Sequence, residues 1–230
     1  MNKFKLTDEK MVWCGHTMYR IVCVTAFASV SVGELGGWVE SEKNLSQSGD
    51  AWVCGNAKVC GNAKVYGDAW VCGNAKVCGN AKVYGDAKVC GNAYVCGNAY
   101  VCENADYIVI KNNWSSGRYF TYTASNKMWN VGCFYGTGEE LIAKAYKDSE
   151  LSGKCYEASV RYVEELERIK AEIQQEEKKM NNCYNCKHCR KWIEVSDCGY
   201  GHIEADCNLD GQKFGHEPIK ECDCKNWEEK

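Results

Sequence analysis

The residues best suited to chemistry are the cysteines and histidines near the end of the chain. Seven cysteines crowd into residues 181–230, and the first three follow the spacing Cys183-x2-Cys186-x2-Cys189. This short spacing in a polar segment directs several thiolates at one ion, which suits tetrahedral Zn²⁺. We therefore predict zinc as the cofactor of this tail, with an iron–sulfur cluster as the competing interpretation. The predicted ligands are Cys183, Cys186, Cys189, Cys198, Cys207, Cys222, Cys224 and His188.

A second set of reactive side chains recurs every 18 residues between positions 49 and 102. Asp50, Asp68 and Asp86 share one phase of this repeat. Stacked about 4.8 Å apart, these carboxylates could bridge a divalent cation or simply occupy a turn that Asp tolerates, and we favour the turn. Two further phases hold cysteines, which could bind metal, oxidise or pack closely. These cysteines are at positions 54, 72 and 90, and at positions 60, 78 and 96.

These phases are set by nine consecutive hexads over residues 49–102, which begin GDAWVC GNAKVC GNAKVY. A chain that turns every six residues and repeats its chemistry after three turns predicts a coil with three sides. Val at the fifth position of each hexad, and Ala two residues earlier, would point inward. Gly at the corner adopts positive φ without steric cost. Trp, Lys, Tyr and Cys are then expected to face outward.

The hexad pattern resembles the hexapeptide-repeat family, whose members form left-handed parallel β-helices. The resemblance covers residues 49–102, with 103–110 as a degenerate last side. The fold class we expect is mainly β: a short three-sided β-helix with 18 residues per coil, capping strands, C-terminal α-helices and a small Cys-rich metal-binding tail. The expected segments are 1–48 (N-terminal β cap), 49–110 (β-helix), 111–137 (β-hairpin cap), 138–180 (helical) and 181–230 (zinc-binding tail).

The segments on either side of the hexads are expected to cap the open ends of the β-helix. Residues 19–24 and 30–32 predict strands, with a turn at 33–37. The stretch GELGGWVESEKNLSQSGDAWV resembles a module that precedes hexapeptide tracts in phage and prophage proteins, which implies an imperfect first coil. After the hexads, residues 118–123 and 128–132 predict a hairpin, and KMWNVGCFYGTGEELIAKAYKDS resembles another phage module.

Residues 138–180 have the apolar spacing of helices. A first helix is predicted over 139–147, and a stripe with 3–4 spacing predicts a second one. Docking on the β-helix is the expected role of this stripe, but homo-oligomerisation through 152–179 is equally compatible with it. The stripe consists of Tyr156, Val160, Val163, Leu166, Ile169 and Ile173.

Composition limits the compartment and the partners. The 230 residues carry a net charge of −3, which gives no global reason to expect nucleic acid. The apolar run at 21–28 follows a segment containing Asp8 and Glu9, which is unlike a signal peptide. No stretch reaches the roughly 20 apolar residues of a membrane span. We therefore expect a protein of the reducing cytoplasm of a host cell.

Acyl transfer is the activity for which hexapeptide-repeat proteins are best known, and it implies a histidine base near the coil surface. Residues 17–187 contain no histidine, and we expect His16 to be an ordinary surface or capping residue. Because a general base must lie within hydrogen-bond reach of its proton, the sequence argues against acyl transfer. We expect no catalytic residues.

Binding to another macromolecule is the function that we expect. Exposed aromatic and acidic residues of the hexads form the predicted binding surface. The phage resemblance implies a host protein as the partner, such as a defence component that this chain would inhibit. The alternatives are zinc-dependent nucleic-acid binding through Lys187, Arg190 and Lys191, and a disfavoured acyltransferase. The predicted surface comprises Trp52, Trp70, Tyr94, Tyr100, Asp50, Asp68 and Asp86.

Overall fold

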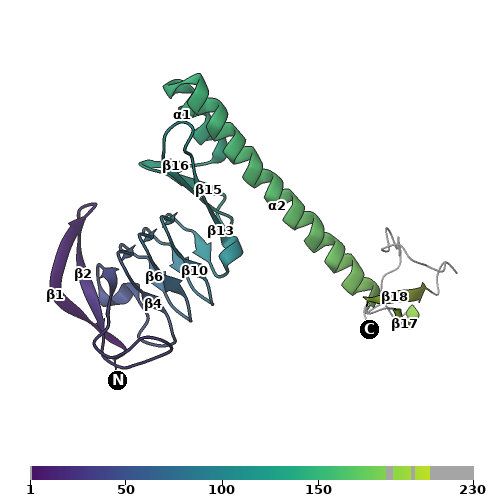
Figure 1. Ribbon diagram of the computed structural model, residues 1–230, viewed down its shortest axis with the longest axis horizontal. Helices are drawn as coiled ribbons and strands as arrows, with labels where there is room; N and C mark the ends of the chain where they lie inside the picture. Colours follow the sequence, from purple (N-terminus) through teal and green to yellow (C-terminus); the bar gives the residue numbers. More distant parts are fainter. Residues whose placement is uncertain (1, 185–188, 198–199, 208–230) are drawn as a thin grey trace. The chain divides into compact units, whose positions relative to one another are not determined.

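A computed structural model describes residues 2–184, 189–197 and 200–207 of the chain, with side chains described over 2–178. The chain divides into two compact units, Met1–Arg161 and Tyr162–Lys230. The first unit contains an N-terminal hairpin, a parallel solenoid, a four-stranded antiparallel sheet and helix α1 (Figure 1).

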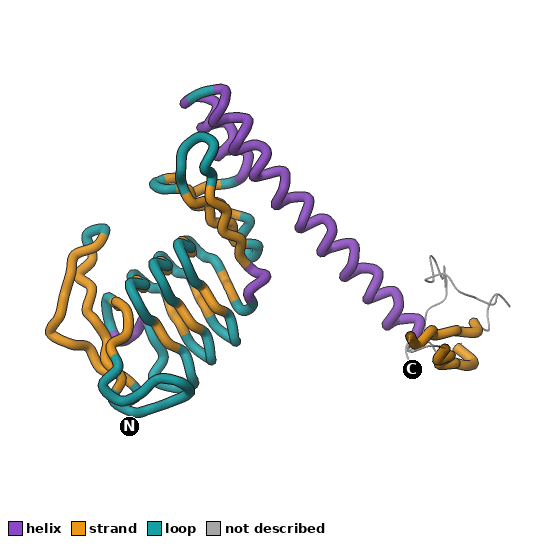
Figure 2. The backbone as a smooth tube through the Cα atoms, viewed as in Figure 1, coloured by secondary structure: helices purple, strands orange, loops and turns teal. Residues whose placement is uncertain are grey.

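A parallel β-solenoid of about four turns forms the centre of the first unit (Figure 2). Each hexad supplies one two-residue strand, and strands 18 residues apart stack in register, as Val53 does on Val71. The three faces are β4-β7-β10, β5-β8-β11 and β6-β9-β12, which confirms the predicted three-sided coil. The strands are β4 (Trp52–Val53), β5 (Lys58–Val59), β6 (Lys64–Val65), β7 (Trp70–Val71), β8 (Lys76–Val77), β9 (Lys82–Val83), β10 (Lys88–Val89), β11 (Tyr94–Val95) and β12 (Tyr100–Val101).

Valine and alanine fill the interior of the solenoid, as their positions in the hexad predicted. Every Val and Ala of the nine hexads is buried, with at most 1% of its surface exposed. The corners need glycine for two reasons, which Gly67 illustrates. Its φ is +70°, and a Cβ built on it would lie 3.1 Å from the backbone nitrogen of Gly85 in the next coil. A larger residue would therefore be strained and would push the stacked coils apart.

Residues 35–53 form the imperfect first coil that the sequence predicted. Strand β3 (Leu35–Val39) pairs in parallel with β5, and the short helix η1 (Glu42–Asn44) leads to a bridge between Leu45 and Val65. The predicted turn over 33–37 is present only at its start, where the Glu34 N–H donates to the Ser31 carbonyl, and residues 35–37 belong to β3 instead. The predicted strand over 30–32 is reduced to a single bridge between Val30 and Phe27. The backbone of Trp38 donates to the Ala57 carbonyl of the next coil, and this ladder draws Gly36 and Gly37 into β3.

An antiparallel hairpin covers the N-terminal end of the solenoid. Strands β1 (Phe4–Trp13) and β2 (His16–Cys23) pair with each other, and β2 pairs with β3. The hairpin thus extends one solenoid face into the six-stranded sheet β1-β2-β3-β5-β8-β11. Because β3 pairs with β5 and β2 then covers the open edge of β3, the hairpin protects backbone groups of this face that would otherwise be unpaired.

A four-stranded antiparallel sheet caps the other end. It contains the hairpin predicted at 118–132, but residues 103–110 do not form a last coil side, because β13 pairs antiparallel with β14. Side chains from this cap bond the open edge: Tyr94 N donates to Thr121 Oγ1 (2.9 Å), and Tyr100 N to Ser125 Oγ (2.8 Å). After η2 (Asn104–Asp106), the strands are β13 (Tyr107–Lys111), β14 (Tyr119–Thr123), β15 (Met128–Val131) and β16 (Phe134–Gly136).

Helix α1 (Gly138–Asp148) follows the sheet and confirms the predicted first helix. Thr137 caps it through a reciprocal pair of hydrogen bonds with Glu140, which satisfies two amide groups at the helix start. Helix α2 (Glu150–Tyr184) begins in the first unit, where Tyr156 packs on Phe120 with ring centroids 4.5 Å apart. The start of the stripe therefore docks on the C-terminal antiparallel sheet, through β14, and not on the β-helix as predicted.

The second unit contains the rest of α2 and a hairpin of β17 (Cys189–Asp197) and β18 (Tyr200–Cys207). The backbone register places Cys189 opposite Cys207. The predicted ligands Cys186, His188, Cys198, Cys222 and Cys224 lie outside the described residues. The side chains of Cys183, Cys189 and Cys207 are also outside the described set, so zinc and the iron–sulfur cluster both stay predictions for the tail.

Lys3 ties the N-terminal strand to the first hexad from a buried position. Its ammonium donates to the carbonyls of Gly49 (3.0 Å) and Ala51 (2.7 Å). Desolvation by the surrounding protein lowers its pKa from 10.5 to about 8, in spite of the nearby carboxylates of Asp50 and Asp68. The charged form therefore costs more in the folded than in the unfolded chain.

This shift predicts a stability that rises with pH between 8 and 10.5. In that window the unfolded chain binds more protons at Lys3 than the folded chain does, so the free energy of unfolding increases as pH rises. Met at position 3 does not titrate. Between pH 7.5 and 10.5 the free energy of unfolding of the wild-type protein should therefore rise by about 1–3 kcal/mol more than that of Lys3→Met. Thermal unfolding of both proteins at pH 7.5 and 10.5 measures the difference, and a difference independent of pH would contradict it.

Candidate functional site

The predicted aromatic surface is divided among the three faces of the solenoid. Trp52 and Trp70 are register partners on one face, while Tyr94 and Tyr100 lie on the other two, as expected. Trp52 is fully buried, however, so its predicted exposure was wrong. The rings of Phe4 and Phe27, whose centroids lie 6.5 and 5.5 Å from that of Trp52, cover it. These residues therefore do not make one continuous binding surface.

The aspartate column serves the turns of the coil. Asp68 accepts a hydrogen bond from the backbone N–H of Asp50 (3.1 Å), and Asn104 accepts one from the backbone N–H of Lys88 (2.8 Å). The first bond joins one coil to the next, and the second joins the last coil to η2. This geometry supports the turn interpretation that we favoured over a bridging cation.

The first cysteine column contains a covalent link between coils. Cys54, Cys72 and Cys90 follow β4, β7 and β10, and Cys72 and Cys90 form a disulfide with Cα atoms 4.7 Å apart. The stacked register brings their Cα atoms within the range that a disulfide requires. Disulfides are rare in a reducing cytoplasm. The compartment predicted from the sequence stays a prediction.

The second cysteine column is headed by a carboxylate and ends at an amide. Glu40, Cys60, Cys78 and Cys96 follow β3, β5, β8 and β11 along one edge of the same sheet. At the far end, Asn130 of the C-terminal cap donates to Cys96 Sγ (3.0 Å). The repeat thus aligns one carboxylate and three thiols in a row along the solenoid.

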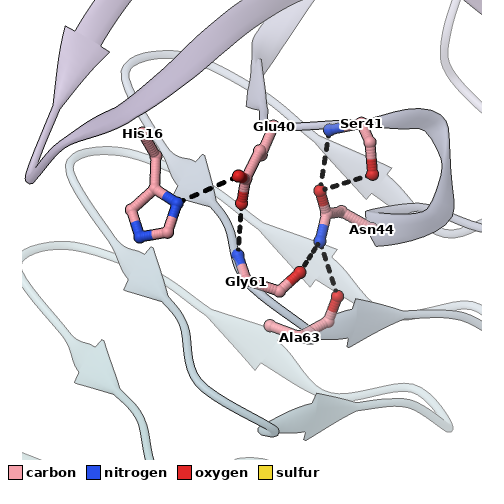
Figure 3. Close-up of polar contacts among 6 residues, drawn as sticks. All are labelled: His16, Glu40, Ser41, Asn44, Gly61 and Ala63. Atoms are coloured by element: carbon pink, nitrogen blue, oxygen red, sulfur yellow. Dashed lines mark hydrogen bonds and ion pairs between the residues drawn. The ribbon is translucent and has the colours of Figure 1, made fainter.

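His16 joins this column from the N-terminal hairpin. Its Nδ1 lies 3.0 Å from Glu40 Oε1, and Glu40 Oε2 accepts the backbone N–H of Gly61 (2.7 Å) (Figure 3). The hydrogen bond with His16, and then that with Gly61, holds the pKa of Glu40 below its usual range. The potential ligand atoms of His16, Glu40 and Cys60 all lie within 4.8 Å of one another.

Hydrogen bonding differentiates the three thiols of the column. Side-chain hydrogen bonding with Cys60, and then with Cys96, lowers the pKa of Cys78. The same bonds, together with burial, raise the pKa of Cys60 and of Cys96.

A pocket of about 300 Å³ opens beside this column, under the tip of the hairpin. Trp13 at the tip reaches across the sheet, with its ring centroid 6.1 Å from that of Tyr94. The side chains that give the pocket its chemistry are Trp13, Cys14, His16, Cys60, Cys78 and Tyr94.

The position of His16 corrects the argument that no histidine stands near the coil. That argument counted only residues 17–187, whereas the hairpin folds His16 back onto the solenoid. The available signal was Cys14-Gly15-His16 between two alternating segments, which is a hairpin turn with Gly in the left-handed region. Glu40 was missed for a similar reason, since its place in the column depends on the irregular first coil.

Helix α2 carries a separate apolar stripe in the second unit. Tyr156, Val160 and Val163 of the predicted stripe are buried, whereas its last three members expose between 36% and 50% of their surface. Tyr162, which was not part of the predicted stripe, is 56% exposed. Polar side chains surround them, including Arg168, which pairs with Glu165 and Glu172. The exposed stripe consists of Tyr162, Leu166, Ile169 and Ile173.

Neither protein-family models nor curated proteins show a match to this chain. What is established is the architecture, a parallel solenoid of about four turns with a spacing of about 18 residues. None of the helices in the described part of the chain combines the length and the apolar character needed to cross a membrane.

Proposed function

We propose that this chain is a non-enzymatic scaffold protein, a left-handed β-helix of hexapeptide-repeat type that acts through protein–protein contacts. The exposed stripe of α2 carries the proposal. Large aliphatic and aromatic side chains that stay in water along one face of a helix lose the free energy that burial would provide. A second copy of α2 is the occupant that fits this stripe best.

The spacing of the stripe supports self-association. Tyr162, Leu166, Ile169 and Ile173 are separated by four, three and four residues, which is the heptad spacing of a two-stranded coiled coil. With Leu166 and Ile173 at the a positions, a parallel pair brings Glu165 opposite Lys170 of the other copy. It also brings Glu172 opposite Glu177. One attractive and one repulsive contact nearly cancel, so the apolar stripe supplies the affinity.

Matched substitutions on α2 test this proposal. Ile169→Glu should convert a dimer of the full-length chain into a monomer, because it buries a carboxylate in the interface. Ala171→Glu introduces the same side chain two residues away on the polar face, and it should leave the dimer intact. Light scattering coupled to size-exclusion chromatography, under reducing conditions, measures the mass of each protein. A monomeric wild-type chain, or a dimer that persists in Ile169→Glu, would refute the proposal.

The partner of the solenoid itself is proposed to be a protein of the host cell. The resemblance of residues 33–53 and 127–149 to phage modules supports this part. Tyr100 offers an exposed aromatic contact on the face β6-β9-β12. The N-terminal hairpin extends a different face, and the first cysteine column follows the strands of the third.

A further inference from the structure

We propose that His16, Glu40 and Cys60, which cluster beside the pocket under the N-terminal hairpin, bind a zinc-type divalent metal ion. This site is distinct from the cysteine-rich tail and is not needed for association through α2. Its three ligand atoms come from parts of the fold that are separate in sequence. They nevertheless lie within 4.8 Å of one another.

The donor set selects the class of metal. An imidazole nitrogen, a carboxylate oxygen and a thiolate sulfur are the three ligand types that Zn²⁺ accepts in proteins. Calcium and magnesium prefer oxygen ligands throughout, and a thiolate would not suit them. The pair His16 and Glu40, now joined by a hydrogen bond, would become joined through the ion.

The fold holds these ligands in place before any ion arrives. Glu40 and Cys60 occupy successive levels of one sheet, because the Glu40 N–H donates to the Val59 carbonyl and the Cys60 N–H to the Val77 carbonyl, both at 3.0 Å. The Gly61 N–H fixes the second carboxylate oxygen of Glu40 at 2.7 Å. Such outer contacts orient ligands in metal sites.

Three protein ligands leave one position of a tetrahedral zinc ion open. The adjoining pocket of about 300 Å³ provides room there for a water molecule or for a further thiolate from Cys14 or Cys78. A buried, fully packed cluster would offer no such access. The site therefore combines ligands with an entry path.

The cysteines of the tail are also predicted zinc ligands. The zinc content of variants at this site is therefore compared with that of the wild type, so that zinc bound by the tail cancels. Full-length wild-type protein, His16→Gln, Cys60→Ser and Cys54→Ser are reduced, saturated with Zn²⁺, dialysed and analysed by elemental mass spectrometry. Cys54→Ser is the matched control, because Cys54 occupies the corresponding position on a neighbouring face. The wild type and Cys54→Ser should hold one more zinc ion per chain than His16→Gln and Cys60→Ser.

Equal zinc content in all four proteins would overturn the proposal, as would a loss in Cys60→Ser without a loss in His16→Gln. Circular dichroism checks that each variant is folded. If Cys60→Ser does not fold, His16→Gln decides, since the side chain of His16 is 40% exposed and its replacement leaves the core intact. Cobalt provides the second readout: the wild-type spectrum minus that of His16→Gln should show the visible bands of a tetrahedral thiolate site, and a flat difference would contradict the assignment.

Discussion

Trp52→Ala is expected to lower the free energy of unfolding by about 3–5 kcal/mol, which is the usual cost of emptying a buried aromatic site. Trp52 has no exposed surface, and it lies where the N-terminal segment closes over the first hexad. The rings of Phe4 and Phe27 pack against it edge-on. Removing the indole leaves a cavity between the cap and the solenoid, so the loss includes packing on both sides.

Trp70→Ala is the matched control for this experiment. Trp70 is the register partner of Trp52 in the next coil, but it is partly exposed to solvent. Its replacement should cost less than half as much, because less apolar surface leaves a buried environment. Urea-induced unfolding of the three proteins measures both values. Equal losses for the two variants would show that Trp52 is not covered by the N-terminal segment.

Val89→Asp is expected to destabilise the solenoid by several kcal/mol, enough to unfold its last coils at room temperature. Val89 is fully buried in a shaft lined by Val and Ala, where a carboxylate finds no partner. In a solenoid each coil is stabilised by its neighbours, so a defect in one coil weakens the adjoining coil and the cap beyond it. The loss should therefore exceed that of an isolated cavity.

Lys88→Asp places the same side chain on the outer face of the same strand. Lys88 is exposed, and its described hydrogen bonds to Asn104 and Tyr107 use only backbone atoms. The change in stability should stay within about 0.5 kcal/mol. Circular dichroism and thermal unfolding of both variants test the pair. A Val89→Asp protein as stable as Lys88→Asp would contradict the inward orientation of the valines.

The solenoid was predictable because the 18-residue period determines which residues are neighbours in space. Val71 touches residues of its own type 18 positions away on either side, so the local pattern defines the core. Short-range patterns also predicted the hairpin at 118–132, from alternation, and the helix at 139–147, from helical periodicity. In these segments the residues that a side chain contacts could be inferred from spacing alone.

The errors concern contacts that no period specifies. The burial of Trp52 depends on Phe4 and Phe27, which are 48 and 25 residues away in the sequence and lie outside the repeat. The approach of His16 to Cys60 depends on where the hairpin folds. Gly36 and Gly37 were assigned to a turn by their type, although hydrogen bonding to the next coil places them in a strand. Long-range packing decided each of these cases.

The stacking of identical coils also means that the number of repeats sets the length of the solenoid. Its length is counted in whole blocks of three hexads, and each block adds one rise of about 4.8 Å between the two end caps. Deletion of residues 67–84 would join Tyr66 to Gly85 and restore the same corner sequence, since Gly67-Asp68 and Gly85-Asp86 are identical. Recombination between such blocks could therefore lengthen or shorten the protein in fixed steps, without altering the sequence of either cap.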